Sequence, residues 1–278
     1  MTFSQSACGS IISRDVREGP ESHAVIARYA GGERGARKAA RSDSVVVVVD
    51  AFRASTTIAV LVSKGARVVS VASVEEAASA RTDFRVGERG SAKVVGFDFG
   101  NSPTEILGSE IPSGSRIALS TTNGTRVVEA ARGARTILTG AFVNAGILAE
   151  ELAGGAHDGA EVVVVGCGWE GRRASEDEAA AGAILHRLRS RGAELDERAR
   201  RVVEGYLSRP EGALRNNSAA RRLKRLGYEE DIEFCLAEDA VPVVPRLVGD
   251  AFVGWVAGSR QFGQSSARGP KQKAQISS

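Results

Sequence analysis

The chain has 278 residues, of which 42% are hydrophobic and 26% charged, as is usual for a soluble globular protein. The net charge of +3 comes without a basic stripe interleaved with aromatic residues, so we expect no nucleic-acid partner. No run approaches the ~18 consecutive apolar residues of a membrane span, and the N-terminus lacks the apolar core of a secretory signal. These features predict a soluble, cytoplasmic protein with no membrane partner.

Cysteine and histidine chemistry has little support in this sequence. Cys8, Cys167 and Cys235 are far apart and form no Cys-x-x-Cys pair, so neither a disulfide framework nor a thiolate zinc site is predicted. The three histidines show no HExxH pattern and predict no histidine-built metal centre. We expect buried, inert cysteines and a chemistry of carboxylates, hydroxyls, arginines and backbone amides.

Short β-branched runs predict the strands, and the clearest is the run of five valines Val45–Val49, closed by Asp50. Continuous apolar runs of this kind are typical of strands covered on both faces. The other predicted strands are Arg67–Val71, Arg116–Leu119, Thr136–Leu138 and Glu161–Val165. The helices predicted between them are Thr56–Lys64, Val74–Arg81, Gly124–Ala131, Asn144–Leu152 and Asp177–Arg191.

This alternation predicts an α/β fold with three α/β/α layers and a mostly parallel or mixed sheet. We expect one domain over residues 1–258, either undivided or split into two α/β subdomains near residue 150, and a disordered basic tail at 259–278. A basic, mainly helical stretch after Gly192 and a last element at Asp231–Leu236 complete the domain. The Gly/Arg/Lys-rich segment Gly31–Arg41 is predicted to be an exposed loop.

The strongest candidate for a ligand site is the end of the valine strand. Asp50 ends this strand, Arg53 comes three residues later, and Ser55 and Thr56 begin the next helix. Ligands of open α/β sheets bind outside the carboxyl ends of strands, where a helix N-terminus attracts an anion such as phosphate. Asp50 can hold Mg²⁺ or attack phosphorus, and Arg53 can pair with the oxygens of an anion. Alternatively, Ser55 is an ordinary N-cap and Asp50 a turn residue.

Two glycine-rich loops and a second strand-to-helix turn carry further candidates. Dense glycine lets a backbone approach a ligand closely, although tight turns explain it equally well. The turn after Leu119 repeats the design of the first, and can cradle a phosphate. The loop candidates are Glu88, Arg89, Asn101 and Ser102, and those of the turn are Thr121, Thr122, Asn123, Gly124 and Thr125.

Glu176 and Asp177 follow the last predicted strand of the series and open a helix. Such acids can simply complement the helix dipole. They can also complete a Mg²⁺ site with Asp50, because Mg²⁺ selects hard oxygen ligands.

A competing site is the pair Cys167 and Arg173, which has the Cys-x5-Arg spacing of cysteine-dependent phosphatases. In those enzymes a thiolate attacks phosphorus while the arginine binds the phosphate. No histidine precedes Cys167, and Glu170 places a negative charge inside the expected cradle. The match is therefore poor, and we keep it as an alternative.

In order, these motifs resemble the 2-phosphosulfolactate phosphatase (ComB) family. The match runs from about residue 45 to 245, and departs from the family pattern at Arg173–Ser175, where the family has a hydrophobic residue or Ser-Leu. The matching blocks are Val-Asp-Ala-Phe-Arg-Ala-Ser-Thr-Thr (49–57), Gly-Glu-Arg-Gly (87–90), Gly-Phe-Asp-Phe-Gly-Asn-Ser-Pro (96–103), Leu-Ser-Thr-Thr-Asn-Gly-Thr-Arg (119–126), Glu-Gly-Arg (170–172) with Glu176-Asp177, and Asp-Ile-Glu-Phe-Cys (231–235) with Val-Val-Pro (243–245).

The resemblance implies a Mg²⁺-dependent phosphoric monoester hydrolase of this fold, in the family's case one that converts 2-phospho-3-sulfolactate to 3-sulfolactate and phosphate in coenzyme M biosynthesis. It also implies a homodimer. The implied catalytic residues are Asp50, Arg53, Glu176 and Asp177, with Asp50, Glu176 and Asp177 as metal ligands. The implied substrate-binding residues are Ser55, Thr56, Glu88, Arg89, Asn101, Ser102, Thr121, Thr122, Asn123, Gly124 and Thr125.

A hypothesis of another class is a non-catalytic member that binds a small anion and has lost turnover. The intact acids Asp50, Glu176 and Asp177 argue against it, since carboxylates facing an anion without a metal weaken its binding.

Overall fold

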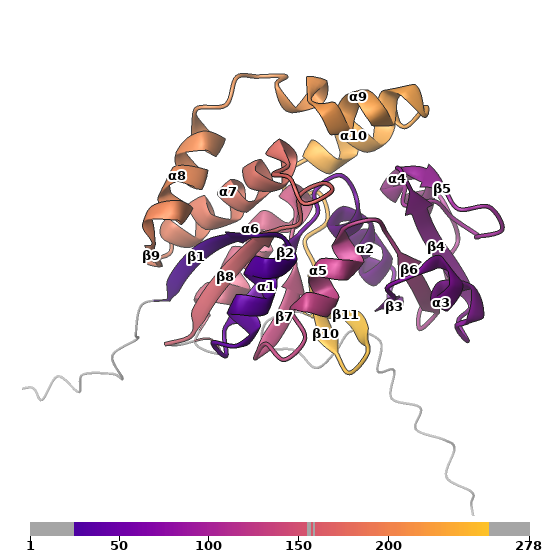
Figure 1. Cartoon of the computed structure of the whole chain (residues 1–278), viewed down its shortest axis with the longest axis horizontal. Coiled ribbons are helices and arrows are strands. Elements are labelled where there is room, and N and C mark those ends of the chain that lie inside the picture. Colours follow the sequence, from indigo (N-terminus) through magenta and orange to yellow (C-terminus); the bar gives the residue numbers. More distant parts are fainter. Residues whose placement is uncertain (1–24, 155–156, 158, 256–278) are drawn as a thin grey trace, which may run out of the picture.

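Eleven strands form one mixed sheet in which an antiparallel hairpin joins two groups of parallel strands (Figure 1). The computed structural model describes residues 25–154, 157 and 159–255. The first group is β4 (Phe84–Arg89), β6 (Arg116–Ser120) and β3 (Arg67–Ser70), with β5 (Ala92–Lys93) antiparallel at its edge. The second group is β7 (Thr136–Thr139), β2 (Val45–Val49), β8 (Glu161–Gly166), β1 (Ile26–Gly31) and β9 (Glu194–Leu195). The hairpin of β10 (Val244–Val248) and β11 (Ala251–Trp255) pairs with β7 on one side and β3 on the other.

Helices cover both faces of the sheet, so the predicted α/β/α fold with a mixed sheet is confirmed. The α-helices are α1 (Gly32–Ala40), α2 (Ala54–Ser63), α3 (Val74–Ser79), α4 (Pro103–Leu107), α5 (Gly124–Ala130), α6 (Ala145–Ala153), α7 (Ser175–Arg189), α8 (Glu197–Leu207), α9 (Ser218–Arg225) and α10 (Glu229–Leu236). Short 3-10 turns lie at Phe142–Asn144 and Leu214–Asn216. The five strands and five helices predicted from the sequence are all present, within two residues at each end.

The valines of β2 show why this strand is apolar throughout. Val45, Val47 and Val49 pack into the core with α6 and α7, whereas Val46 and Val48 pack into the opposite core with α1, α2 and α5. All five are buried. A strand covered on both faces has no solvent side on which a polar residue could alternate, as the sequence predicted.

The predicted exposed loop at Gly31–Arg41 is wrong, because α1 occupies nearly all of it. Ala36 and Ala39, three residues apart, are buried in the core, and their small side chains let the helix lie close to the sheet. The charged residues face outward, as in an amphipathic helix. The Gly/Arg/Lys-rich composition concealed this spacing.

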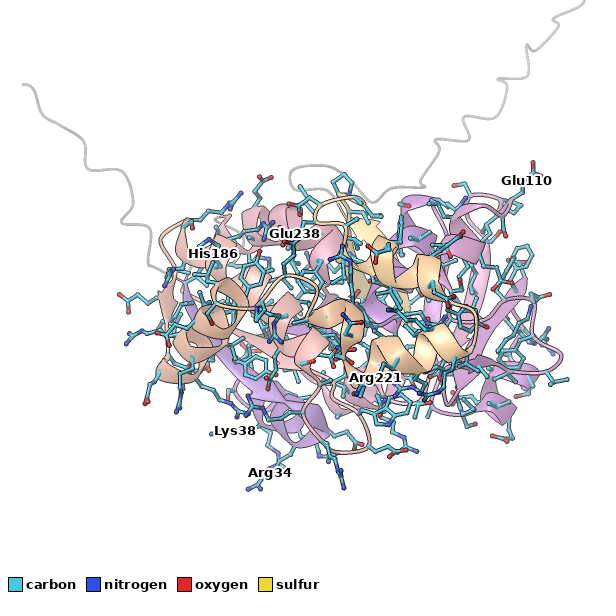
Figure 2. All side chains as sticks on the ribbon, turned by 90° about the horizontal axis from the view of Figure 1, so that it is seen from above. Arg34, Lys38, Glu110, His186, Arg221 and Glu238 are labelled. Carbon is cyan, nitrogen blue, oxygen red and sulfur yellow. The ribbon has the colours of Figure 1, made fainter. Side chains whose placement is uncertain are left out.

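The late helices α9 and α10 lie over the end of the molecule where the parallel strands finish (Figure 1). Seen from above, α9, which carries Arg221, lies over the middle of the molecule (Figure 2). This arrangement brings residues near position 220 above the strand ends near positions 50 and 170.

Several expectations fall outside these observations. The predicted tail at 259–278 and the first 24 residues, including Cys8, lie outside the described residues. The division near residue 150 stays a prediction. Among the described residues, no helix combines the length and apolarity needed to cross a membrane.

Candidate active site

A pocket beyond the ends of the parallel strands collects acidic residues from three separate segments. Its volume is about 20 Å³, room for a group the size of a water molecule or a metal ion. Its four acidic residues are Asp50, which is partly buried, and Glu88, Glu176 and Asp177, which are buried. We call the site the carboxylate pocket. The predicted site residues that line it are Asp50, Arg53, Glu88, Asn101, Asn123, Glu176 and Asp177.

The other predicted residues lie nearby without lining this pocket. Ser55, Thr121, Gly124 and Thr125 line a cavity of about 10 Å³ that shares Asp50 with it. The remaining four, Thr56, Arg89, Ser102 and Thr122, line neither cavity and make internal hydrogen bonds.

Asp50 is held by the turn between β2 and α2. Its N–H donates to Ser55 Oγ at 2.9 Å, and its Oδ1 accepts from the Ala54 N–H at 3.3 Å. Ser55 Oγ in turn donates to the Val48 carbonyl at 3.2 Å. Ser55 therefore serves the turn, and the first N–H group of α2 is already occupied by Asp50.

Asp177 ties together the segments that follow β2 and β8. Its Oδ1 accepts from the Ala51 N–H at 2.9 Å and its Oδ2 from the Gly168 N–H at 2.8 Å. Gly168 has φ +74°, and a Cβ there would lie 2.3 Å from the Arg172 carbonyl oxygen, so a larger residue would disrupt this turn. Asp177 is thus as much a structural acceptor as a candidate ligand.

Glu176 and Glu88 are fixed by groups that local sequence patterns do not reveal. Glu176 Oε2 accepts from Asn217 Nδ2 at 2.8 Å, and Asn217 also caps α9. Glu88 accepts the N–H groups of Thr122 and Ser91, each at 2.6 Å. Both carboxylates therefore have fixed orientations in the pocket.

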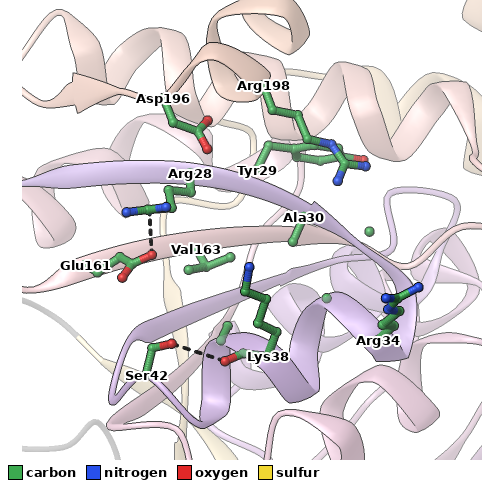
Figure 3. Close-up of a pocket in the computed structure, with 13 residues that line it drawn as sticks. Arg28, Tyr29, Ala30, Arg34, Lys38, Ser42, Glu161, Val163, Asp196 and Arg198 are labelled. Carbon is green, nitrogen blue, oxygen red and sulfur yellow. Dashed lines mark hydrogen bonds and ion pairs between the residues drawn. The ribbon is translucent and has the colours of Figure 1, made fainter.

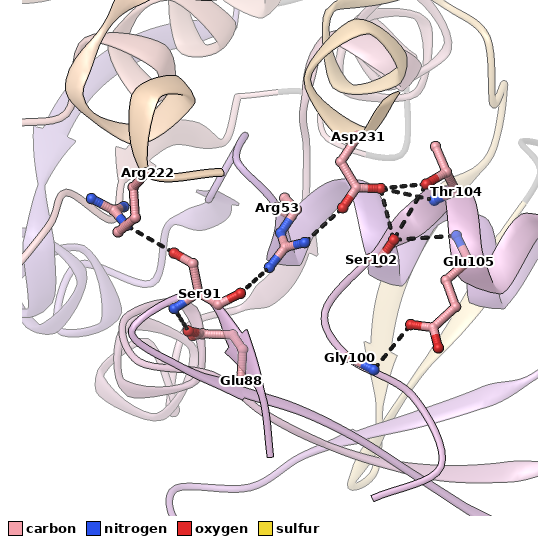
Figure 4. A network of polar contacts seen from close by, with 9 residues as sticks. All are labelled: Arg53, Glu88, Ser91, Gly100, Ser102, Thr104, Glu105, Arg222 and Asp231. Carbon is pink, nitrogen blue, oxygen red and sulfur yellow. Dashed lines mark hydrogen bonds and ion pairs between the residues drawn. The ribbon is translucent and has the colours of Figure 1, made fainter. Parts of the chain in front are cut away.

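Arg53 lies at the centre of a buried network (Figure 4). Its Nη1 donates to Asp231 Oδ2 at 2.6 Å and its Nη2 to the Ser91 carbonyl at 2.7 Å, while its guanidinium stacks on Tyr228 at 4.3 Å. The second oxygen of Asp231 accepts from the Ser102 hydroxyl at 2.8 Å. The charge of Arg53 is thus neutralised by Asp231, which lies outside the predicted site set.

Crowding of the acids changes their protonation. Burial, followed by the charge of Glu88, raises the pKa of Asp50 from 3.8 to about 7. Burial and the charges of Asp50 and Glu176 raise the pKa of Asp177 well above its usual range. Burial also raises the pKa of Glu176. Buried, mutually repelling carboxylates are typical of functional sites and of sites that hold a cation.

The raised pKa of Asp50 predicts that the metal-free protein loses stability as pH rises. Between pH 3.8 and about 7 the folded protein keeps a proton on Asp50 that the unfolded chain has released. This stabilisation is fully present below pH 3.8 and is lost as pH rises through 7. The free energy of unfolding should fall by about 4 kcal/mol from this carboxyl alone. Urea unfolding in EDTA, in buffers from weakly acidic to weakly alkaline, measures the free energy of unfolding against pH. This free energy should fall less steeply in Asp50→Asn than in the wild type. Equal slopes in the two proteins would contradict the raised pKa of Asp50.

The donors in the pocket fit a hard divalent cation such as Mg²⁺. They are carboxylate oxygens together with Asn101 Oδ1, which is buried and has no partner among the described residues. A Cβ at Gly124 would lie 3.0 Å from Asp50 Oδ2, so glycine there keeps space beside this oxygen. In the described ranges no three Asp, Glu, His or Cys side chains are already grouped around one ion position. Mg²⁺ commonly binds through one or two carboxylates and several waters, which agrees with this arrangement.

The structure does not bring Cys167 and Arg173 together as a phosphate-binding pair. Cys167 is buried, and burial raises the pKa of its thiol well above the usual range, so it stays protonated. Arg173 is exposed and pairs with Glu178, with Nη2 2.9 Å from Oε2. Cys235 is also a buried free thiol.

Replacement of Cys167 by alanine is therefore expected to leave phosphate release close to that of the wild type. A protonated, buried thiol is a poor nucleophile, and only a small void is created. Steady-state assays of the two proteins, with circular dichroism to check folding, measure this. Abolished activity in a folded Cys167→Ala protein would restore the cysteine-dependent alternative.

A larger cavity, of about 500 Å³, lies elsewhere, between α1 and strand β1 (Figure 3). Its charged lining residues are four basic and two acidic ones, and its Arg28 pairs with Glu161 at 2.7 Å. It shares no residue with the carboxylate pocket and contains no predicted site residue. The predicted site residues therefore point to the smaller carboxylate pocket rather than to the larger cavity.

Comparison with known proteins agrees with the motifs. The family model of 2-phosphosulpholactate phosphatase matches residues 30–250. A probable 2-phosphosulfolactate phosphatase of Gloeobacter violaceus is 42% identical over 212 residues, which cover 72% of this chain and 86% of that protein. One of Thermotoga petrophila is 38% identical over 213 residues, covering 74% and 90%. The chain belongs to the 2-phosphosulfolactate phosphatase family.

Membership of the 2-phosphosulfolactate phosphatase family confirms the recognition made from the motifs, and with it the predicted class of enzyme, a phosphoric monoester hydrolase. Residues outside the predicted set also line or support the carboxylate pocket. Asp231 lies within a matching block, but nothing around it in the sequence indicated a role in the site. Asn217 lies in a polar run that is typical of a helix start. Trp169 and Ser91 line the pocket, and Arg222 contacts both.

Proposed function

We propose that this protein hydrolyses the phosphate ester of 2-phospho-3-sulfolactate to 3-sulfolactate and phosphate, with Mg²⁺ in the carboxylate pocket. The observation that supports this most is the convergence of four oriented carboxylates, three of them buried, in one pocket of a phosphatase-family chain. Without a cation this charge would repel the anionic substrate. With a cation bound, the carboxylates would hold the cation, and the cation would attract the phosphate.

The chain's own residues have distinct roles in this proposal. Asp50 Oδ2, which accepts no hydrogen bond from the described residues, and Glu176 would hold Mg²⁺, and Asn101 Oδ1 would take a remaining position or orient a bound water. Bound Mg²⁺ would supply neutralisation of charge on the phosphate oxygens. Asp177 keeps the two strand ends together, and Arg53 keeps the wall formed by Ser91 in place.

A substrate panel tests the proposal. Phosphate release in Mg²⁺ buffer is measured from 2-phosphosulfolactate, phosphoglycolate, phospholactate and para-nitrophenyl phosphate. We expect the highest kcat/KM for 2-phosphosulfolactate. Release only from the other esters would retain a phosphatase and reject this substrate. Binding without release from any ester would favour the non-catalytic alternative.

A further inference from the structure

We propose that Arg222, with Trp169 and Ser91, forms an anion subsite beside the carboxylate pocket that binds a second acidic group of the substrate, a carboxylate or a sulfonate. This inference rests on the proposed function, since it assigns the part of the substrate that does not react. Arg222 lies outside the sequence motifs, on helix α9, which is far from Asp50 along the chain.

Two contacts fix the guanidinium of Arg222. Its central carbon lies 3.6 Å from the centroid of the Trp169 ring. Its Nε donates to Ser91 Oγ at 2.8 Å, as Figure 4 shows. A stacking contact sets the plane of the group and a hydrogen bond sets its rotation within that plane. Because Trp169 and Ser91 both line the carboxylate pocket, the arginine is placed at its side.

The two supports are themselves rigid. Trp169 begins a tight turn closed by two backbone hydrogen bonds with Arg172, each 2.9 Å long. Ser91 is buried, its N–H donates to Glu88 Oε2 at 2.6 Å, and its carbonyl accepts from Arg53 at 2.7 Å. Arg222 is therefore held by the same network that holds the pocket, unlike a mobile surface arginine.

Arg222 has no direct ionic partner within the described part of the chain. No carboxylate there forms an ion pair with it, and its two terminal nitrogens have no hydrogen-bond partner, whereas Arg53 is paired with Asp231. Burial lowers the pKa of Arg222 below its ordinary value, and the charges of Glu176 and Glu88 offset this only in part. Neither of these acids forms an ion pair with Arg222, so its terminal nitrogens stay available. An oriented guanidinium with both terminal nitrogens available suits two parallel hydrogen bonds to an oxyanion.

A binding experiment tests the subsite without relying on turnover. Calorimetry in Mg²⁺ buffer measures the affinity of wild type, Arg222→Gln and Arg225→Gln for 3-sulfolactate and for inorganic phosphate. Arg225, on the same helix, is exposed, and its replacement removes the same charge. Loss of hydrogen bonds to a charged group should weaken sulfolactate binding about 10- to 100-fold in Arg222→Gln. Phosphate binding should change little, as should both affinities in Arg225→Gln.

Kinetics give the second readout. Arg222→Gln should lower kcat/KM for 2-phosphosulfolactate while leaving that for para-nitrophenyl phosphate, which has no second acidic group, nearly unchanged. Arg222→Lys, which keeps the charge without the paired donors, should fall between. Unchanged sulfolactate affinity, or equal losses for both ligands or both esters, would overturn the subsite. If sulfolactate binds through Arg222 but the wild type releases phosphate from no ester, the subsite stands and the proposed reaction fails.

Discussion

Asp50→Asn is expected to lower kcat for phosphate release by on the order of 10³-fold or more. The amide keeps the shape and the hydrogen bond from Ala54, but removes the negative charge at the centre of the carboxylate pocket. In the proposed site, loss of that charge would weaken the binding of the cation and, with it, the positioning of the phosphate. Steady-state phosphate release at saturating Mg²⁺ measures the effect.

The matched control is Asp43→Asn, an exposed aspartate in the turn before the same strand, at φ +53°, which asparagine also tolerates. It should keep wild-type activity. A folded Asp50→Asn protein with activity within a few-fold of wild type would remove Asp50 from the chemistry and leave it as a turn residue.

Asp231→Asn is expected to have the largest effect on stability. Asp231 is fully buried against Arg53, which is 2% exposed, and the ion pair is 2.6 Å long. Removal of one partner leaves a buried charge unpaired, which typically costs about 3–5 kcal/mol. Urea unfolding at neutral pH, followed by circular dichroism, measures the free energy of unfolding.

The exposed pair Arg215 and Glu233, with its nitrogen and oxygen 2.9 Å apart, provides the contrast. Glu233→Gln should cost about 0–1 kcal/mol, because solvent screens the pair. Equal costs for Asp231→Asn and Glu233→Gln would show that the network around Arg53 does not depend on its buried charge.

The parts of the site that sequence reasoning located are those beside a recognisable strand or helix end. Asp50 follows five valines, and Glu176 and Asp177 open a helix, so each has a local signal and a place in the pocket. Asp231 and Asn217 reach the site only through the packing of α9 and α10 over the sheet, which no local pattern encodes.

Roles were harder to predict than positions. Ser55 has the local signature of an anion-binding helix start, yet its hydroxyl donates to the Val48 carbonyl and serves the turn. Arg53 has the charge to bind a phosphate but is occupied by Asp231. The number of hydrogen bonds that a hydroxyl or guanidinium has left for a ligand depends on the folded neighbours.

Some strands of the sheet also lacked a recognisable sequence pattern. Strand β10 escaped prediction because Pro245 lies within it and a proline cannot donate to the sheet. Its hairpin with β11 nevertheless joins the two groups of parallel strands. Strand β1 was also missed, because it alternates exposed and buried residues, unlike the apolar runs of the five predicted strands.

The most direct test of the carboxylate pocket as a metal-dependent phosphatase site is the return of Mg²⁺ to the stripped enzyme. The protein is treated with EDTA, dialysed, and assayed for phosphate release from 2-phosphosulfolactate as Mg²⁺ is added. We predict no release before addition, saturable recovery in the wild type, and no recovery in Asp50→Asn. Full activity of the stripped wild type, or equal recovery in Asp50→Asn, would contradict the assignment of this pocket.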